Sequence, residues 1–175
     1  MSGHSKWSTI KHKKAATDAK RGAVFGKLAK KIYLAVKQGG SGDVLKNPFL
    51  RGVLEEARSA NMPSDNVRRA IDKALGVGGE QVMVEIDYEG YGPSGVGIII
   101  KCVTDNRNRT GGEIRTCFDK YGGSLGEPGS VSYMKKIEPV PMIELVGQDL
   151  GKIKDLLETL EDHEDIVSVW SNLKQ

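Results

Sequence analysis

The residues best suited to chemistry are concentrated at the amino terminus, where lysines and arginines far outnumber acids. Between Met1 and Lys31 there are nine lysines or arginines and a single acid, Asp18. Such a segment attracts phosphate groups, and a tryptophan among the cations offers a ring on which a base can stack. The candidate nucleic-acid-binding residues of this segment are Lys6, Trp7, Lys11, Lys13, Lys14, Lys20, Arg21, Lys27, Lys30 and Lys31.

Two other interpretations of this segment stay open. A lysine-rich segment is also typical of a solvated helix face that binds nothing. Trp7 is as well suited to anchor the segment in a hydrophobic core as to stack on a base. His4 and His12 are too far along the chain from His163 to predict a metal site, so we expect phosphate contact or solvation for both.

A second pair of candidates, Arg107 and Arg109, flanks Asn108 near the predicted start of a helix in an otherwise acidic region. Guanidinium groups bind phosphate through paired hydrogen bonds, which favours a nucleic-acid contact. The same groups can instead cap the helix and pair with nearby acids. The sequence leaves both roles open.

No arrangement of residues predicts an enzyme. The glycine-rich stretches lack the Gly-Lys-Ser/Thr ending of a phosphate-binding loop, and the acids of residues 158–165 predict a solvated cluster rather than a catalytic carboxylate pair. Cys102 and Cys117 form no Cys-x-x-Cys motif and are expected to be buried free thiols. We therefore expect no catalytic residue, metal, cofactor or small-molecule substrate.

Charge is divided unequally along the 175 residues. Residues 1–75 contain sixteen Lys or Arg against six Asp or Glu, a net charge of +10, and residues 76–175 contain ten against seventeen, a net charge of −7. Only the first part suits a polyanion, and the second is expected to contact protein partners or shape a cleft. Without a membrane-length apolar run or a signal-peptide pattern, the sequence predicts a cytoplasmic protein that binds no membrane.

The basic residues are predicted to lie on the first of three helices. At 100° per residue, four apolar residues fall on the same side of this helix as Phe25, and five lysines fall on the opposite side. Gly39-Gly40 ends the helix, and residues before about Ala15 are expected to form an irregular arm. The apolar residues are Leu28, Ala29, Ile32 and Val36, and the lysines are Lys20, Lys27, Lys30, Lys31 and Lys37.

Two further helices complete this part. Asn47-Pro48 predicts the start of the second, with Asn as the cap and Pro at the first helical position. Asn61-Met62-Pro63-Ser64 separates it from the third, and the glycine-rich stretch 76–79 ends the third and forms a hinge. Residues 1–76 are thus predicted to be a basic three-helix domain.

After the hinge the apolar period changes from 3.6 to 2, which is typical of strands. Strands are predicted at 82–88, 96–103, 131–137, 142–146 and 166–170, with helices at 109–121 and from Asp149 to Leu160. This order, ββαββαβ, is the ferredoxin-like βαββαβ pattern preceded by one extra strand. Residues 80–175 are predicted to be an acidic, ferredoxin-like α/β sandwich, and the whole chain belongs to the α+β class.

Seven stretches of the sequence closely resemble the YebC family, position by position. Members of that family are described as transcriptional regulators in bacteria and as translational activators in mitochondria, so the resemblance implies a nucleic-acid-binding regulator that is not an enzyme. The stretches are Gly3 to Trp7, Ile10 to Ala16, Asp18 to Gly22, Ala60 to Pro63, Tyr88 to Pro93, Thr104 to Thr110 and Gly129 to Val131.

The chain departs from the family pattern after residues 131–133. Typical members carry a further small α/β domain there, whereas in this chain Lys136-Ile137-Glu138-Pro139 runs almost directly into the last β-α-β segment. The usual inserted third domain is therefore expected to be missing.

Three functions remain after these observations. The resemblance favours a DNA-binding transcriptional regulator, and the alternative is a ribosome-associated translation factor that binds ribosomal RNA. A third hypothesis is a protein-interaction adaptor whose basic segment meets an acidic partner. Because lysine is a point charge suited to phosphates rather than to paired base contacts, the sequence does not predict a specific target sequence.

Overall fold

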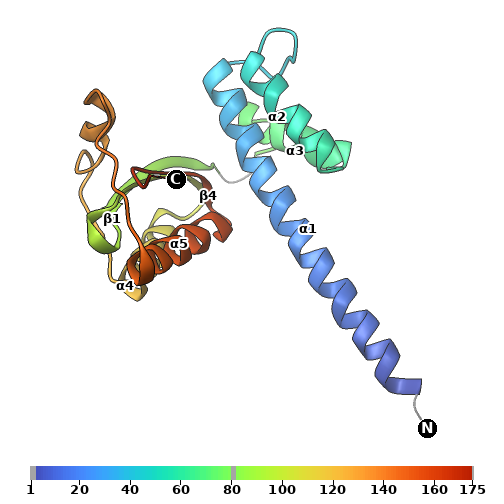
Figure 1. Ribbon diagram of the computed structural model, residues 1–175. Coiled ribbons are helices and arrows are strands. Elements are labelled where there is room, and N and C mark those ends of the chain that lie inside the picture. The colour runs from blue at the N-terminus through green and yellow to red at the C-terminus, as the bar shows by residue number, and fades with distance from the viewer. Residues whose placement is uncertain (1–2, 80–81, 175) are drawn as a thin grey trace. The chain divides into compact units, whose positions relative to one another are not determined.

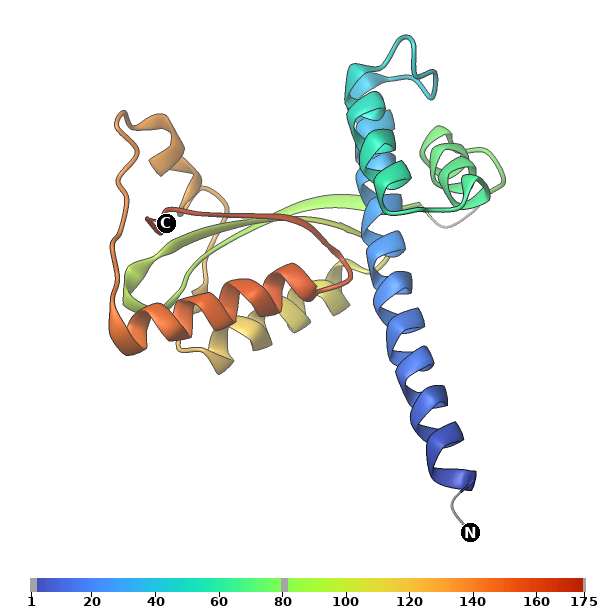
Figure 2. The ribbon, with the colours of Figure 1, turned by 45° about the vertical axis from the view of Figure 1, so that its right-hand side comes forward.

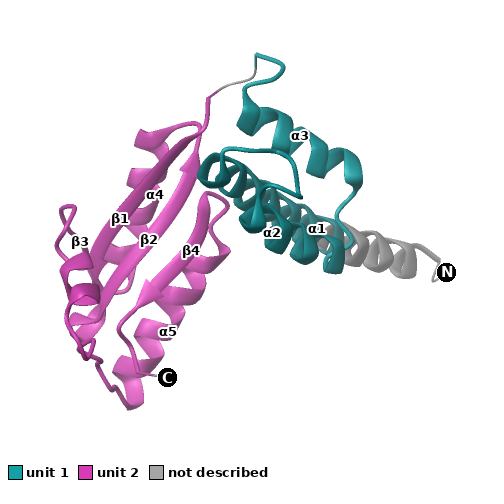
Figure 3. Ribbon diagram, turned by 90° about the horizontal axis from the view of Figure 1, so that it is seen from above, with its two compact units in different colours: residues 1–80 teal, residues 81–175 magenta. Residues whose placement is uncertain are grey.

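The computed structural model describes residues 3–79 and 82–174, and it describes side chains from Thr17 onward. The chain divides into two compact units, residues 1–80 and 81–175, which Figure 3 shows in teal and magenta.

Unit 1 consists of three helices: α1 (Gly3–Gly39), α2 (Pro48–Ser59) and α3 (Ser64–Leu75), as Figure 1 shows. The three-helix module expected from the sequence is confirmed. The irregular arm expected before Ala15 is wrong, because α1 is helical from Gly3. Apolar periodicity misses such a segment, since lysine and alanine have good helix propensity and need no apolar stripe to be helical.

Asn47 fixes the connection between α1 and α2. As predicted, it caps α2: its side-chain oxygen accepts a 3.0 Å hydrogen bond from the backbone N–H of Leu50, and Pro48 follows at the first helical position. Its amide nitrogen donates to the carbonyl oxygens of Ala35, at 2.9 Å, and Ser41, at 2.8 Å. Asn47 is fully buried, so all these bonds lie away from solvent and hold the start of α2 against the end of α1.

The core of unit 1 forms around the second half of α1. The predicted stripe is confirmed at Leu28, Ile32 and Val36, which are buried, while Phe25 and Ala29 are half-buried. Residues 32–36 are all buried because α1 packs against both α2 and α3 there. Residues 17–24 of α1 are all exposed, and they include the cations Lys20 and Arg21.

Unit 2 is a four-stranded antiparallel sheet with the order β3-β1-β2-β4. Its strands are β1 (Val84–Tyr91), β2 (Gly97–Thr104), β3 (Ser124–Leu125) and β4 (Ile166–Ser171), and its helices are α4 (Arg107–Lys120) and α5 (Gly147–Asp162). Figure 2 shows both helices on one side of the sheet. The α+β class and the sandwich of two helices on a sheet agree with the prediction.

The predicted extra strand is in fact a central one. β1 pairs with β2 along its whole length, from Val84 opposite Thr104 to Tyr91 opposite Gly97, and the short 3-10 helix η1 (Pro93–Gly95) joins them. From β2 the chain passes through α4 to β3, on the far side of β1. This split β-α-β arrangement places α4 across the sheet.

Two predicted strands are wrong. Residues 131–137 contain a 3-10 helix, η2 (Ser132–Lys136), and residues 142–146 contribute only an isolated bridge between Ile143 and Leu173. The buried side chains near η2 are Val131 and Met134, three residues apart, and this spacing fits the period of a 3-10 helix rather than the alternation of a strand. The short β3 was not predicted.

The carboxylate of Glu89 holds the segment before η2. It accepts hydrogen bonds from the backbone N–H groups of Gly129 at 2.9 Å, Val131 at 2.6 Å and Ser132 at 2.8 Å. Burial acts to raise the pKa of Glu89, but these hydrogen bonds to its charged form outweigh burial and hold the pKa below its ordinary value.

The core of unit 2 lies between the sheet and its two helices. Strand β2 contributes alternate residues, Ile98, Ile100 and Cys102, and all of them are buried. Helix α4 contributes Ile114 and Phe118. Helix α5 contributes three further apolar residues one turn apart, which are Ile153, Leu156 and Leu160. Both cysteines are free, as predicted, and Cys102 is buried while Cys117 is half-buried.

Candidate nucleic-acid interface

The described candidate cations of α1 differ in their exposure. Lys20 and Arg21 are exposed, and Lys27 and Lys30 are half-buried. Their spacing places Lys20, Lys27 and Lys31 on one stripe of the helix, so three positive charges point in similar directions. The other candidates lie outside the residues whose side chains the structure describes, and they are Lys6, Trp7, Lys11, Lys13 and Lys14.

Lys31 forms an ion pair with a residue of another helix. Its ammonium nitrogen lies 2.6 Å from a carboxylate oxygen of Glu56, which belongs to α2. The side chains are 36% and 52% exposed, so this ion pair sits at the edge of the α1–α2 contact. The sequence grouped Lys31 with the phosphate-binding candidates because helical periodicity cannot show which residue of another helix lies opposite.

A groove of about 460 Å³ lies between α1 and α3, and the sequence did not predict it. Residues at helical spacing on both elements line it, with Gly22, Phe25, Gly26 and Ala29 on α1 and Asn66, Arg69, Ala70 and Lys73 on α3, and Met62 lines it as well. The α1 side is small and apolar, whereas the α3 side carries an amide and two cations. The sequence feature that could have indicated this groove is the recurrence of Asn66, Arg69 and Lys73 at intervals of three and four residues, which places them on one side of α3.

Arg107 and Arg109 are in different situations despite their spacing of two. Arg107 is exposed at the first position of α4. The guanidinium of Arg109 pairs with Asp105 at 3.2 Å and with Asp165 at 2.9 Å. The hydrogen bond and charge of Asp165 raise the pKa of Arg109 above its ordinary value. Of the two roles left open for Arg109, these contacts favour the structural one.

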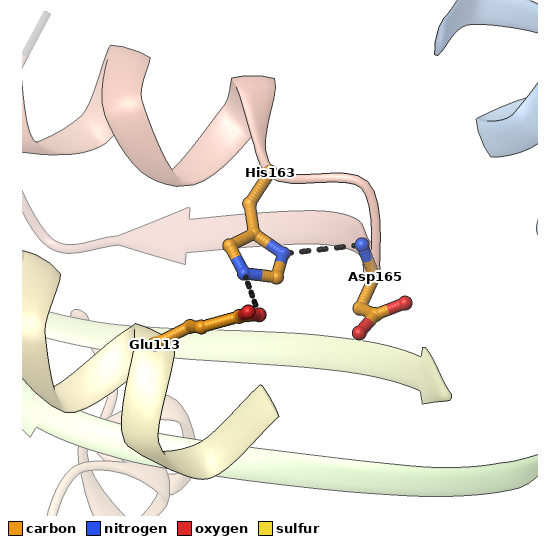
Figure 4. Close-up of side chains that lie close together, drawn as sticks. All are labelled: Glu113, His163 and Asp165. Carbon is orange, nitrogen blue, oxygen red and sulfur yellow. Dashed lines mark hydrogen bonds and ion pairs between the residues drawn. The ribbon is translucent and has the colours of Figure 1, made fainter. Parts of the chain in front are cut away.

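Asp165 belongs to a polar cluster that also contains Glu113 and His163 (Figure 4), whose potential ligand atoms lie within 4.8 Å of one another. The backbone N–H of Asp165 donates to His163 Nδ1 at 3.1 Å, so Nδ1 is the acceptor and Nε2 is left to donate to Glu113, 3.0 Å away. The buried hydroxyl of Thr110 donates to Asp165 at 2.7 Å.

These bonds tie the start of α4 to the turn between α5 and β4. Because the guanidinium of Arg109 already faces Asp165, its positive charge opposes a metal cation at this cluster. We therefore interpret the cluster as a structural link. Sequence spacing could not predict it, since Glu113 and His163 are 50 residues apart.

The fold and the site define a class: a two-unit α+β protein whose helical unit carries the net positive charge. The profile of the TACO1/YebC protein N-terminal domain matches residues 5–77, and that of the TACO1/YebC second and third domain matches residues 83–136. The chain belongs to the TACO1/YebC family. The second match ends at residue 136, where the sequence analysis places the missing inserted domain.

Similar proteins come from several bacteria. A probable transcriptional regulatory protein of Bacillus licheniformis is 47% identical over 182 residues, which cover 100% of this chain and 75% of the relative. A protein of the same description from Brachyspira hyodysenteriae is 46% identical, over 97% of this chain and 70% of its own. The crystal structure of a conserved hypothetical protein from Aquifex aeolicus matches with a TM-score of 0.77 and 30% identity, over 90% of this chain and 91% of that one.

In the described part of the chain, no helix has both the length and the apolar character that crossing a bilayer requires.

Proposed function

We propose that this chain is a non-enzymatic regulator of transcription that binds DNA through its helical unit. The observation that carries this proposal is the separation of charge between the two units. Ten excess positive charges lie in residues 1–75, and seven excess negative charges lie in the rest of the chain. A polyanion is attracted to the first and repelled by the second, so binding through the helical unit is favoured.

The contacts in this proposal are mainly to phosphates. On the described part of α1, Lys20 and Arg21 are exposed candidates and Lys27 and Lys30 are half-buried candidates, and the candidates before Thr17 extend the same helix. Arg107 is a further candidate because it is exposed at a helix start in unit 2. Phosphate contacts position a protein on nucleic acid without reading its sequence.

The role in transcription rests on the relatives, whose names describe probable transcriptional regulatory proteins. The alternative proposal is a translation factor that binds ribosomal RNA. The same lysines suit it, since A-form RNA is recognised largely through its phosphates and shape. In either case the acidic unit is left to contact a protein partner.

Binding measurements with the full chain test the proposal and its alternative. We expect a fluorescent DNA duplex to bind with an affinity whose logarithm falls linearly with the logarithm of salt concentration, with a slope of about −0.9 for each phosphate neutralised. Sedimentation of a lysate through sucrose should leave the protein out of the ribosome fractions. Stable sedimentation with ribosomes together with weak duplex DNA binding would replace transcription by the translation alternative.

A further inference from the structure

We propose that the groove between α1 and α3 receives one unpaired nucleotide, with its base against the α1 side and its phosphate at the cations of α3. This inference rests on the proposed nucleic-acid function and adds a ligand to it: an extruded or single-stranded nucleotide rather than the intact surface of a duplex. Its basis is the set of residues that line the two sides of the groove.

The α1 side of the groove is apolar, and its largest side chain is that of Phe25. Phe25 is half-buried there, with Gly22 and Gly26 beside it on the same side of the helix. A phenylalanine ring is a platform on which a base of any identity can stack. Glycines next to the ring keep side chains from occupying the space that a stacked base would need.

The α3 side is polar and positively charged. Asn66 presents an amide, which can both donate to and accept from the edge of a base. The Arg69 guanidinium bonds to the Asn66 side chain at 2.6 Å and to the Asp65 carbonyl oxygen at 3.3 Å, so it is held beside the groove. These bonds use two of the five N–H donors of a guanidinium. Lys73 lines the groove one turn further along α3.

An apolar ring opposite an amide and two cations matches the chemistry of a nucleotide. A base combines a flat apolar face with polar edges, and its phosphate carries the negative charge that Arg69 and Lys73 attract. An apolar peptide side chain would match the ring but would offer no polar edge or charge to the α3 side. The volume of about 460 Å³ lies within the range of about 300–1,000 Å³ typical of small-ligand sites.

The two glycines are otherwise unexplained by the packing of unit 1. Glycine inside a helix costs about 0.5–1 kcal/mol relative to alanine. A Cβ added at Gly22 or Gly26 would meet no atom of the described residues within 4 Å, so no close contact among them requires glycine there. Glycine at such positions is expected where a ligand approaches the backbone closely.

The proposal is tested with duplexes that carry one bulged nucleotide. Two versions have the same length and charge, and they differ only in whether the bulged position has a base or is abasic. By fluorescence anisotropy at fixed salt, we expect the full chain to bind the version with the base about tenfold more tightly, because stacking on one ring contributes that order of affinity. DNA and RNA versions are measured side by side, and the backbone that shows the larger difference identifies the ligand.

Gly26→Leu fills the groove and should abolish this difference. Leucine favours a helix more than glycine does, and its Cβ meets open space, so we expect the helix content measured by circular dichroism to be unchanged or higher. Gly52→Leu is the matched control, because Gly52 faces open space on α2 and does not line the groove. Phe25→Leu keeps an apolar side chain but removes the ring, and it should lose the difference as well.

The outcomes separate this inference from the proposed function. If binding depends on salt but the base and abasic versions bind with equal affinity, the proposal that the groove receives a nucleotide is wrong, and the proposed nucleic-acid function is unaffected. A tenfold difference in affinity between the base and abasic versions that persists in Gly26→Leu also contradicts the groove proposal. If no DNA or RNA binds at any salt concentration, both the inference and the proposed function fail.

Discussion

Arg109 and Asp165, 56 residues apart in the chain, form an ion pair of 2.9 Å between Nη2 and Oδ2. Asp165 is only 2% exposed, and its carboxylate also accepts the hydroxyl of Thr110. The pair joins the first turn of α4 to the residue that precedes β4. Moving a carboxylate out of water costs free energy, and a buried carboxylate without a cationic partner has nothing to offset that cost. The pair therefore contributes to the stability of the fold, even though Arg109 reaches the surface.

The first prediction compares the two arginines of this segment. Arg109→Gln should lower the melting temperature of the protein, because it leaves Asp165 without its cation, and it should change nucleic-acid affinity little. Arg107→Gln should leave the melting temperature unchanged, because Arg107 is exposed. Thermal unfolding and anisotropy on both variants make the comparison. A drop in affinity in folded Arg109→Gln, with none in Arg107→Gln, would reverse the roles given to the two residues.

Thr110→Val tests the same cluster from inside the core. Thr110 is fully buried, and valine keeps its shape while removing the hydroxyl that donates to Asp165. We expect a decrease of about 2 kcal/mol in unfolding free energy, as for a hydrogen bond to a charged group. Denaturant unfolding measures it, and a variant as stable as the parent would show that Asp165 does not depend on this bond.

The elements predicted well from the sequence are those that local rules determine. Asn47-Pro48 starts α2 as expected, because capping involves a residue and its immediate neighbours. The segment 131–137 was predicted wrongly as a strand, because a few apolar residues beside exposed lysines fit a strand and a 3-10 helix almost equally well. The apolar run 142–146 was also predicted wrongly as a strand, and it contributes only an isolated bridge. A tertiary contact favours the 3-10 helix at 131–137. The carboxylate of Glu89 accepts hydrogen bonds from the backbone N–H groups of Val131 and Ser132, where η2 begins.

Glu89 gives a prediction about pH. Because its pKa in the folded state lies below the ordinary value of 4.5, its contribution to stability is fully present above that value. The contribution disappears as pH falls through the lower pKa of the folded protein. Denaturant unfolding of the full chain should therefore show falling stability at acid pH below about 4.5.

Glu89→Gln is the variant that isolates this effect. The amide keeps one acceptor oxygen but replaces the other with a donor that faces backbone N–H groups, so we expect unfolding free energy to fall by about 2 kcal/mol at neutral pH. The stability of the variant should also depend less on pH below about 4.5, because the titrating group is gone. Parent and variant with the same acid dependence would assign the effect to other carboxylates.

Substitution of Asn47 should lower the unfolding free energy more than the substitutions above, and its effect should be confined to unit 1. Asn47→Ala removes the cap of α2 and leaves the carbonyl oxygens of Ala35 and Ser41 without their donor, at a cost of about 3 kcal/mol. Asn47→Asp keeps an acceptor for the Leu50 N–H but cannot make either donated bond. Hydrogen exchange at the α2 amides should accelerate in both variants. Equal exchange in parent and alanine variant would mean that packing alone holds α2 in place.

The candidate site was less predictable than the fold. The sequence identifies cations by their number and helical side, and α1 does present Lys20 and Arg21 to solvent. It could not show that Lys31 meets Glu56, because the partner lies on another helix, 25 residues away. The groove required knowing which side of α3 lies opposite α1. Pairings of this kind are set by tertiary packing, which one sequence does not display.

The last prediction concerns the lysines of α1. Changing Lys20, Lys27 and Lys30 together to Gln should leave the fold intact and weaken binding to every duplex sequence, because phosphate contacts are independent of sequence. The log-log salt slope should become shallower by up to about 2.7, at about 0.9 for each phosphate that is no longer neutralised.

A matched variant with Lys120, Lys152 and Lys154 changed to Gln removes the same charge from unit 2 and should keep the parent slope. Lys31→Gln by itself should instead lower the unfolding free energy slightly, by about 0.5 kcal/mol, as expected for an exposed ion pair. If the unit 2 variant flattens the slope as much as the α1 variant does, the attraction depends on net charge alone and the α1 surface is not the binding site.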